Sequence, residues 1–256
     1  MNPEKSKMEK GNLVKAFHSQ FDQEIPPILQ QTTCGIASLY TALSYLGRDL
    51  PSYPEFLKKY VEHGSYNIPV HTVNLPIGRG QVKVPIAYVK PGASLAEENT
   101  EVSNALSPFS NLPLNAPIER SFDPNQEPKR SFTIANGFDH RGIDSFLKGE
   151  LGIDDISVEI RESDKLPDVL PENSVILASV IQSKLGYPAR LTTFRSSIAT
   201  HVVPIVQIGE LNNSKVALFS DPAFLNTHDG LQVREVESFE SSLAGKYTIL
   251  TDSSQD

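Results

Sequence analysis

A single cysteine, Cys34, is the residue of this 256-residue sequence best suited to act as a nucleophile. It lies in the stretch "QQTTCGIASLYTALSYLG", at the start of an amphipathic helix that the spacing of apolar residues predicts over 33–46. A thiolate in the first turn of a helix is close to the positive end of the helix dipole and to unpaired N–H groups, and both lower the pKa of the thiol. The next residue, Gly35, lets a substrate carbonyl approach the backbone. Because free cysteine is also a common buried packing residue, this position alone leaves both roles open.

A thiolate nucleophile needs a base, and histidine fits because its pKa lies near neutrality. Of the six histidines, His201 opens the apolar stretch "HVVPIVQIG", which predicts a strand over 201–209. A side chain at the start of such a strand is held rigidly and can point at a neighbouring helix end. The other five lie in polar, loop-rich, helix-flanking or turn-like surroundings that are typical of structural or surface histidines: His18, His63, His71, His140 and His228.

Asp221 is the expected partner of the second ring nitrogen of His201. It ends the predicted strand "KVALFSD", and the turn signal "GELNNS" separates this strand from the one that His201 opens. In an antiparallel hairpin, the start of the first strand and the end of the second lie side by side. Pro222 then turns the chain out of the strand. The sequence therefore predicts Asp221 beside His201, although an aspartate that opens a turn before proline is common.

The elements that must position these residues are helices in the first part of the chain and strands in the last part. Further helices are predicted from Pro54 onward and over 143–151, and Gly47 is expected to end the first helix in a left-handed conformation. Strands are predicted over 156–162, 174–182, 201–209 and 215–221, with a final one from residue 246. Helices followed by a largely antiparallel sheet form an α+β arrangement.

The domain organisation is expected to be simple. A polar N-terminal arm over residues 1–20 is predicted to be flexible, and a single domain over residues 21–256 follows it. A segment rich in proline and asparagine, at about residues 64–137, interrupts this domain and offers only short strand-like pieces such as "VKVPIAYV". A lid, a substrate-binding insertion and a small subdomain all fit such a segment.

Composition excludes several classes of function. The formal charge is −8, from 23 basic and 31 acidic residues, and basic residues do not cluster, so neither nucleic acid nor an anionic membrane surface is an expected partner. One cysteine cannot form an intramolecular disulfide or a paired-cysteine metal site. The N-terminus lacks the apolar region of a signal peptide, and no apolar run of about 18 residues predicts a membrane span. A cytoplasmic protein is expected, with export by a signal-less route left open; nothing indicates the oligomeric state.

The cysteine helix and the histidine–aspartate pair together resemble the C39-like peptidases, in the papain-like cysteine protease superfamily. The family pattern is a glutamine, then Cys-Gly-x-Ala-Ser/Ala-Leu and an apolar helix that ends in Leu-Gly or Tyr-Gly. "HVVPIVQIG" followed by "ALFSDPA" is similar to the family's histidine strand and its Asp-Pro. The resemblance implies a papain-like fold, with an N-terminal nucleophile helix packed on a C-terminal, mainly antiparallel sheet. It also implies Cys34 as nucleophile, His201 as general base and acid, and Asp221 as the residue that orients His201.

The family also uses a glutamine, whose amide and the N–H of the nucleophile together stabilise the oxyanion. This glutamine usually lies six residues before the cysteine, where the present sequence has Ile28. Gln30 and Gln31, four and three residues before Cys34, are the candidates, and Gln30 is preferred because it is the more distant.

The function that the resemblance implies is a thiol hydrolase that cleaves a peptide, isopeptide or related amide bond through a thioester acyl-enzyme. It requires no metal and no organic cofactor, and its partner is a peptide or protein substrate. Two other functions fit the same residues: an acyltransferase that passes the acyl group to an amine or thiol, and a catalytically inactive binding module that keeps the fold.

Overall fold

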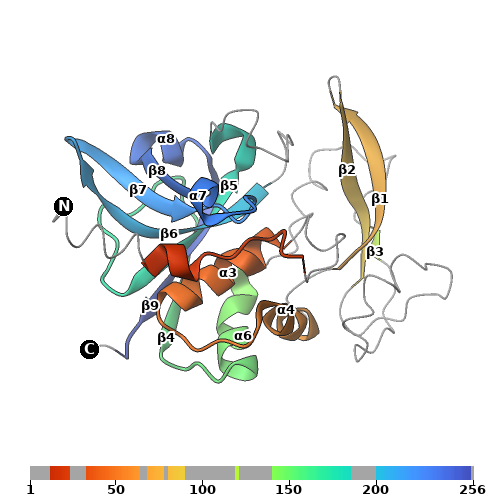
Figure 1. Ribbon diagram of the computed structural model, residues 1–256, viewed down its shortest axis with the longest axis horizontal. Coiled ribbons are helices and arrows are strands. Elements are labelled where there is room, and N and C mark those ends of the chain that lie inside the picture. Colours follow the sequence, from red (N-terminus) through yellow and green to blue (C-terminus); the bar gives the residue numbers. More distant parts are fainter. Residues whose placement is uncertain are drawn as a thin grey trace.

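A six-stranded, fully antiparallel sheet forms the C-terminal part of the protein, in the order β4-β9-β5-β6-β7-β8 (Figure 1). The computed structural model describes residues 12–23, 33–63, 68–77, 80–89, 119–120, 140–185 and 200–254. The six strands are β4 (Ile156–Arg161), β5 (Ser174–Ile181), β6 (Thr200–Leu211), β7 (Ser214–Ser220), β8 (Leu231–Glu235) and β9 (Leu243–Asp252). The five strands predicted from the sequence are confirmed; β8 was not predicted.

The helices lie on both faces of this sheet. They are α3 (Cys34–Tyr45), α4 (Tyr53–Glu62), α6 (Ile143–Glu150), the short α7 (Thr227–Gly230) and α8 (Val236–Glu240), with 3₁₀ turns at His140–Gly142 and Gln182–Leu185. Helices α3, α4 and α6 share one core with one face of the sheet, whereas α8 packs on the other face. This arrangement of helices on an antiparallel sheet is the α+β class that the sequence predicted.

The central strand β5 shows why its sequence is a continuous apolar run. Val175 and Leu177 point into the core beneath α3, and Ile176 and Ala178 point into the core beneath α8. A strand covered on both faces cannot alternate between apolar and polar residues, because successive side chains both enter a core.

Helix α3 packs its apolar face on β5 and β6 and ends where the sequence predicted. Ile36, Leu39 and Leu43 are fully buried in the core. Gly47 has a φ of +79° and follows the last turn, where its N–H donates to the Ser44 carbonyl. Only a residue that tolerates the left-handed region ends a helix in this way at low cost, which is why glycine stands there.

The hairpin that joins β6 to β7 is also confirmed. Leu211 pairs with Ser214, which leaves Asn212 and Asn213 as a two-residue turn with φ values of 51° and 64°. Two successive positive φ values match the right-handed twist of the flanking strands, and asparagine accepts them readily. This turn fixes the register of the two strands that carry His201 and lead to Asp221.

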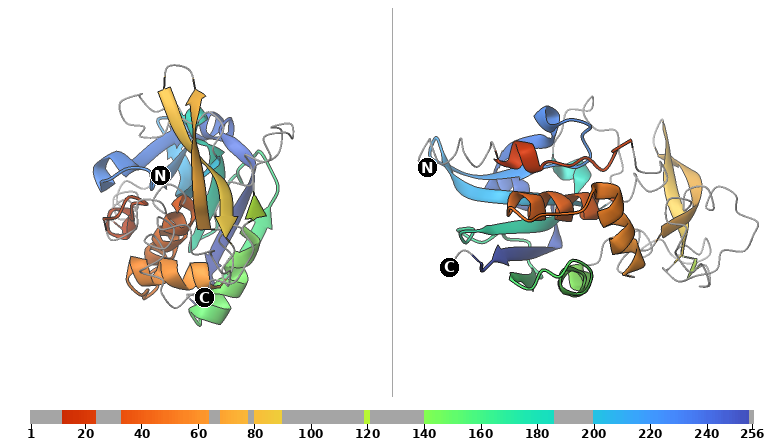
Figure 2. Two further views of the ribbon diagram at one scale, coloured as in Figure 1. Left: turned by 90° about the vertical axis from the view of Figure 1, so that its right-hand side faces the viewer. Right: turned by 60° about the horizontal axis from the view of Figure 1, so that its bottom comes forward.

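The segment expected to be rich in loops contains a second sheet, whose first two strands are longer than the short strand-like pieces that the sequence indicated. Strands β1 (Ile68–Ile77) and β2 (Gly80–Val89) form a long antiparallel pair, and β3 (Glu119–Arg120) pairs with the end of β2. Pro69, Pro76 and Pro85 made these strands look like loops, but proline is tolerated where a strand has no neighbour on one side. Figures 1 and 2 show this second sheet beside the six-stranded sheet and its helices, not as a continuation of it.

The described half of the expected N-terminal arm packs on the domain. Residues 12–16 form a helical turn, and Leu13 is fully buried in the core with α3. The His18 N–H donates to the Thr41 hydroxyl at 3.0 Å, and the Gln20 N–H donates to the Pro222 carbonyl at 2.9 Å. Residues 12–20 are therefore part of the folded domain and not a flexible arm; residues 1–11 lie outside the described residues.

The helices of the described residues are all too short or too polar to cross a membrane.

Candidate active site

His201 and Asp221 are in direct contact at the open end of the β6–β7 hairpin. Nε2 of His201 lies 2.6 Å from Oδ1 of Asp221, and both side chains are buried. Strand β6 carries His201 as its second residue, and Asp221 follows the last residue of β7. The predicted hairpin thus brings the two residues together as expected.

A tight loop holds the carboxylate of Asp221 in place. The Asp221 N–H donates to the Gly230 carbonyl at 2.8 Å, and Oδ1 of Asp221 accepts the Ala223 N–H at 2.8 Å. Because Pro222 cannot continue the β ladder, the chain leaves the sheet at this point and folds back under the carboxylate. The orientation of the carboxylate is therefore fixed by its own loop and by His201.

Cys34 is the first residue of α3; the residue is half-buried, and its thiol is hydrogen-bonded to His201. Since Nε2 of His201 is directed at Asp221, Nδ1 is the ring nitrogen left for the thiol. The sulfur also accepts hydrogen bonds from the backbone N–H groups of Gly35 and Val202. Cysteine, histidine and aspartate thus form one continuous series of contacts.

The electrostatics of this series favour a thiolate–imidazolium pair. Burial raises the pKa of Cys34, but His201 and the two backbone N–H groups outweigh burial and bring the pKa below its ordinary value. Burial lowers the pKa of His201, but Asp221 and Cys34 reverse this and raise it to about 10. At neutral pH His201 is therefore protonated, and its positive charge favours the thiolate form of Cys34.

The structure brings together three of the five residues that the sequence proposed for the site. Cys34, His201 and Asp221 are in contact, while Gln30 and Gln31 lie outside the described residues. Their catalytic roles stay predictions. Among the described residues, no group of three or more histidine, cysteine, aspartate or glutamate side chains could hold a metal ion.

Two of the histidines that the sequence indicated as structural, His63 and His140, contact the hydroxyls of other residues. His140 is buried between strands β9 and β5, where its ring nitrogens contact the hydroxyls of Thr248 at 2.7 Å and Ser179 at 2.9 Å. His63 contacts the Ser145 hydroxyl at 2.9 Å. His228 lies in α7. The side chain of His71, in β1, lies outside the described residues.

His18 belongs to an aromatic cluster that borders the start of α3. Its ring centroid lies 3.9 Å from that of Tyr53, and its Nε2 lies 3.2 Å from an oxygen of Asp22. Burial raises the pKa of the Tyr53 hydroxyl, and the negative charges of Cys34 and Asp22 raise it further. The segment over residues 18–22 therefore runs past the helix end that carries the nucleophile.

Gln20 lies on this segment and was not among the sequence candidates. It is 97% buried, and its backbone is bonded to Pro222, the residue after Asp221. The family's glutamine lies close before the cysteine, whereas Gln20 stands fourteen positions before Cys34. Gln20 lies between Ser19 and Phe21 and belongs to no apolar pattern, so no local signal indicated that it is buried.

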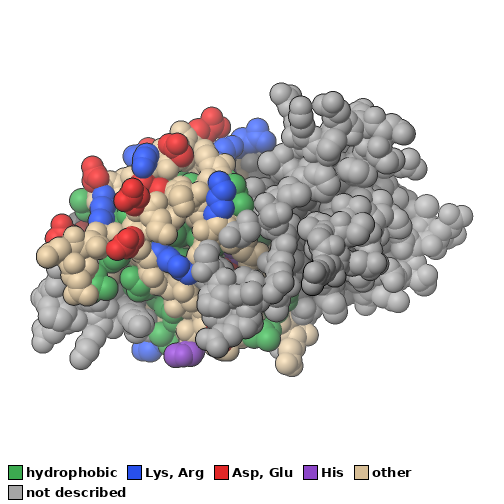
Figure 3. All heavy atoms as spheres, turned by 90° about the horizontal axis from the view of Figure 1, so that it is seen from above, with side chains coloured by type: hydrophobic (Ala, Val, Ile, Leu, Met, Phe, Trp, Pro, Cys, Tyr) green, Lys and Arg blue, Asp and Glu red, His purple; other side chains and the backbone are tan. Residues whose placement is uncertain are grey.

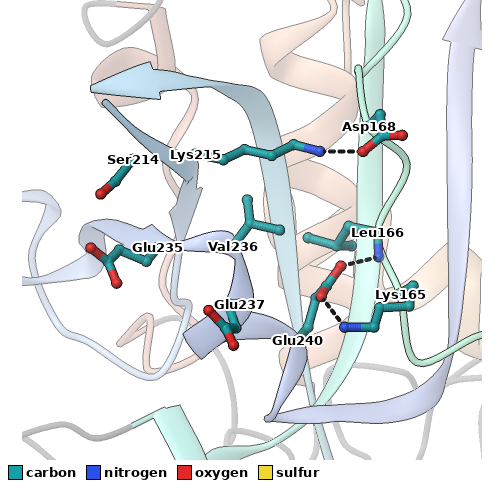
Figure 4. Close-up of a pocket in the computed structure, with 9 residues that line it drawn as sticks. All are labelled: Lys165, Leu166, Asp168, Ser214, Lys215, Glu235, Val236, Glu237 and Glu240. Atoms are coloured by element: carbon teal, nitrogen blue, oxygen red, sulfur yellow. Dashed lines mark hydrogen bonds and ion pairs between the residues drawn. The ribbon is translucent and has the colours of Figure 1, made fainter. Parts of the chain in front are cut away.

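A surface pocket on the opposite face of the sheet does not offer comparable chemistry. It lies between α8, the start of β7 and the loop after β4, and its two lysines are paired with carboxylates (Figure 4). Lys215 contacts Asp168 at 2.7 Å, and Lys165 contacts Glu240 at 2.8 Å. The described residues of its lining include neither cysteine nor histidine, so they offer no thiol–imidazole pair. On the described surface seen in Figure 3, basic and acidic side chains are interspersed.

No protein-family model matches this chain, and a search of the curated proteins found no match.

Proposed function

We propose that this protein is a thiol hydrolase with a papain-like fold, similar to the C39-like peptidases, that cleaves a peptide, isopeptide or related amide bond. The observation that carries the proposal is the continuous series of contacts from Cys34 through His201 to Asp221. A nucleophile at a helix start, a histidine on the adjoining strand and an acidic residue that orients it are the parts that covalent acyl transfer requires.

The reaction proceeds through a thioester. The Cys34 thiolate attacks the substrate carbonyl carbon, and the π electrons move to oxygen to give a tetrahedral oxyanion. The C–N bond then breaks while the imidazolium of His201 gives its proton to the leaving amine. Neutral His201 next takes a proton from water, whose oxygen attacks the thioester carbonyl. Collapse of this second oxyanion expels the Cys34 thiolate, releases the acid and leaves His201 protonated again.

The oxyanion needs hydrogen-bond donors already in position. The backbone N–H of Cys34 is one, because the first N–H groups of a helix have no partner within the helix. We propose the side-chain amide of Gln20 as the second. Its burial and the anchoring of its backbone beside Asp221 support this role, as does the passage of its segment beside Tyr53 and the start of α3. Gln30 and Gln31 stay as the competing candidates from the sequence.

The first experiment is the alkylation rate of Cys34 by iodoacetamide as a function of pH, in the wild type and in His201→Ala. Because Cys34 is the only thiol, the rate reports this residue alone. We expect the wild type to react well below the ordinary thiol pKa of about 8.5, and the variant to lose this reactivity. A wild-type rate that titrates near the ordinary value, or a thiol that never reacts, would refute the proposal.

A second experiment separates hydrolysis from acyl transfer. The wild type and Cys34→Ala are incubated with a mixture of peptides, with and without hydroxylamine as an added nucleophile, and the products are identified by mass spectrometry. A hydrolase releases free carboxylates in the absence of the amine, whereas an acyltransferase gives products only with an acceptor. If no peptide is converted with or without hydroxylamine, whether or not Cys34 is reactive, the result favours a catalytically inactive binding module.

A further inference from the structure

We propose that Ser38 is a positioning residue that holds the backbone of Val202 against the nucleophile helix and thereby sets the geometry of the Cys34–His201 pair. This inference rests on the proposed function, because it assigns a role within the same site. It adds a residue that touches neither the thiol nor the imidazole.

The geometry begins with one buried hydrogen bond. The hydroxyl of Ser38 donates to the carbonyl of Val202 at 2.8 Å, and the Ser38 side chain is fully buried. Ser38 lies one helical turn after Cys34, so both residues face the same side of α3. Val202 directly follows His201 in β6.

Helix α3 contacts the backbone of Val202 at two points. The N–H of Val202 donates to the Cys34 sulfur, and its carbonyl accepts from Ser38. In an antiparallel strand, the N–H and C=O of one residue point to the same side, so both bonds can be made by one neighbour. Here that neighbour is a helix with two polar side chains one turn apart.

On one side Val202 pairs with Ser179 of β5, but on the β7 side no strand reaches it. The pairing of β6 with β7 begins at Ile205 opposite Phe219, so it does not reach Val202. Strand β7 ends at Ser220. The chain turns at the next residue, Asp221, whose carboxylate lies beside His201. On the β7 side the backbone of the buried Val202 therefore has no partner strand, and α3 supplies the hydrogen bonds instead.

This arrangement links the position of His201 to the position of Cys34. With the Ser38 hydroxyl removed, the Val202 carbonyl is left buried without this donor, which is costly, and the strand start shifts to find another. A shift of Val202 moves both its N–H and the adjoining His201 away from the sulfur. The thiolate then loses two of the groups that stabilise it.

The test compares Ser38→Ala with Ser242→Ala, a matched control. Ser242 is also a fully buried serine whose hydroxyl donates to a backbone carbonyl, that of Phe239, but it lies in the part of the chain that packs with α8. The full chain is used, the readout is the pH profile of Cys34 alkylation by iodoacetamide, and thermal unfolding is recorded in parallel.

We expect Ser38→Ala to slow alkylation at pH 6 by about tenfold and to move the profile toward that of an ordinary thiol. Ser38→Thr keeps the hydroxyl and should restore the rate to within about twofold of the wild type. Ser242→Ala should lower the unfolding temperature by a similar amount while leaving the alkylation profile unchanged. If Ser38→Ala does not fold, Ser38→Thr and Ser38→Val make the same comparison at nearly equal volume.

Three results would overturn the inference. If the wild type reacts at low pH and the variant lacking the hydroxyl keeps its profile, Ser38 has only a structural role and the proposed function stands. The same follows if Ser242→Ala shifts the profile as much as Ser38→Ala. If the wild-type profile is itself that of an ordinary thiol, the proposed function fails, and this inference fails with it.

Discussion

Oδ1 of Asp221 accepts two hydrogen bonds, one from Nε2 of His201 at 2.6 Å and one from the Ala223 N–H at 2.8 Å. Both bonds end on the same oxygen, so the amide oxygen of an asparagine could accept both. Replacing Asp221 by asparagine therefore removes the negative charge and keeps an acceptor for both of these donors. The effect of the charge of Asp221 can therefore be measured apart from the effect of its hydrogen-bond geometry with a single substitution.

We predict that Asp221→Asn destabilises the fold by about 1.5–3 kcal/mol at pH 6, the value of a hydrogen bond to a charged group. Asp221 helps to raise the pKa of His201 above its ordinary value of 6.5, to about 10. The stabilisation from protonated His201 is therefore complete below pH 6.5 and is lost as the pH rises through 10. Urea unfolding of both proteins from pH 6 to pH 10 should show the difference shrinking with rising pH.

Asp229→Asn is the control for this prediction. Asp229 is a half-buried aspartate in the neighbouring α7 and contacts the Asn226 amide. Its replacement should change stability little at any pH. A destabilisation by Asp221→Asn that stays constant from pH 6 to pH 10 would contradict the assignment of the effect to the charge on His201.

Gln20→Ala should slow acyl transfer to Cys34 without slowing alkylation of Cys34. Attack on an ester carbonyl develops an oxyanion, whereas displacement of iodide from iodoacetamide by sulfur does not. Loss of one oxyanion donor typically costs 10²- to 10³-fold in rate. We expect a loss of this size in the release of 4-nitrophenol from 4-nitrophenyl acetate, with the iodoacetamide rate within about twofold of the wild type.

Gln30→Ala and Gln31→Ala provide the comparison, since the sequence proposed both residues for the same role. They should leave both rates near those of the wild type. If either of them selectively slows ester cleavage while Gln20→Ala does not, the oxyanion donor is the residue that the sequence proposed and not Gln20. If Gln20→Ala slows both reactions equally, its role is to support the fold around Cys34.

The sequence predicted the contact of His201 with Asp221 because short-range signals determine it. The Asn212–Asn213 turn fixes the hairpin, and Pro222 ends the second strand, so two residues twenty positions apart meet at one end. The pairing of β6 with β7 stops at Ile205 and Phe219, however, so the strands alone do not place Asp221 against His201. The loop at Asp221 completes the contact. That loop depends on Gly230, which no local pattern connects to Asp221.

The residues that the sequence did not identify are those that long-range contacts define. Gln20 is buried because its backbone bonds to Pro222, about two hundred positions away. Ser38 is one of several small residues on α3, and its hydroxyl finds a carbonyl to bind only because the β6–β7 pairing ends before Val202.

The full lengths of strands β1 and β2 were not predicted for a different reason. Their prolines are typical of loops, and a strand tolerates proline only at an edge that has no neighbouring strand.

Arg48 is expected to be a main contributor to stability outside the site. Its guanidinium contacts Asp155 at 2.8 Å and the buried Asp252 at 2.5 Å, which ties the segment after α3 to one end of the β4–β9 pair, where Ile156 lies opposite Asp252. Arg48→Met should lower the free energy of unfolding by about 2–3 kcal/mol at pH 7, because Asp252 is left buried without its cation. Urea unfolding at pH 7 and at pH 3 measures the effect.

The pH dependence of this effect follows from Asp252. Burial raises the pKa of this carboxyl, but hydrogen bonds from Ser254 and the charge of Arg48 together bring it below the ordinary value of 3.8. Its contribution is complete above pH 3.8 and is lost as the pH falls through the lower folded value. The difference in the free energy of unfolding between Arg48→Met and the wild type should therefore be smaller at pH 3.

Arg161→Met is the control. It breaks an exposed ion pair with Glu159 and should change stability little.

Gly230→Ala is expected to damage both the fold and the site, because this glycine is in close contact with the loop that holds Asp221. A Cβ at this position would lie 2.5 Å from the ring of Phe17 and 3.2 Å from the Asp221 carbonyl. The half-buried ring of Phe17 must therefore move, and the Asp221 backbone is already bonded to the Gly230 carbonyl. We expect the free energy of unfolding in urea to fall by about 1–3 kcal/mol, together with slower alkylation of Cys34 at pH 6.

Gly149→Ala, in α6, is the control. A Cβ at this position meets no atom within 4 Å, and the substitution should be neutral or stabilising by up to about 1 kcal/mol, since alanine favours a helix over glycine. If Gly230→Ala lowered stability but left alkylation unchanged, the close packing at Gly230 would serve the fold alone, and the position of Asp221 would not depend on it.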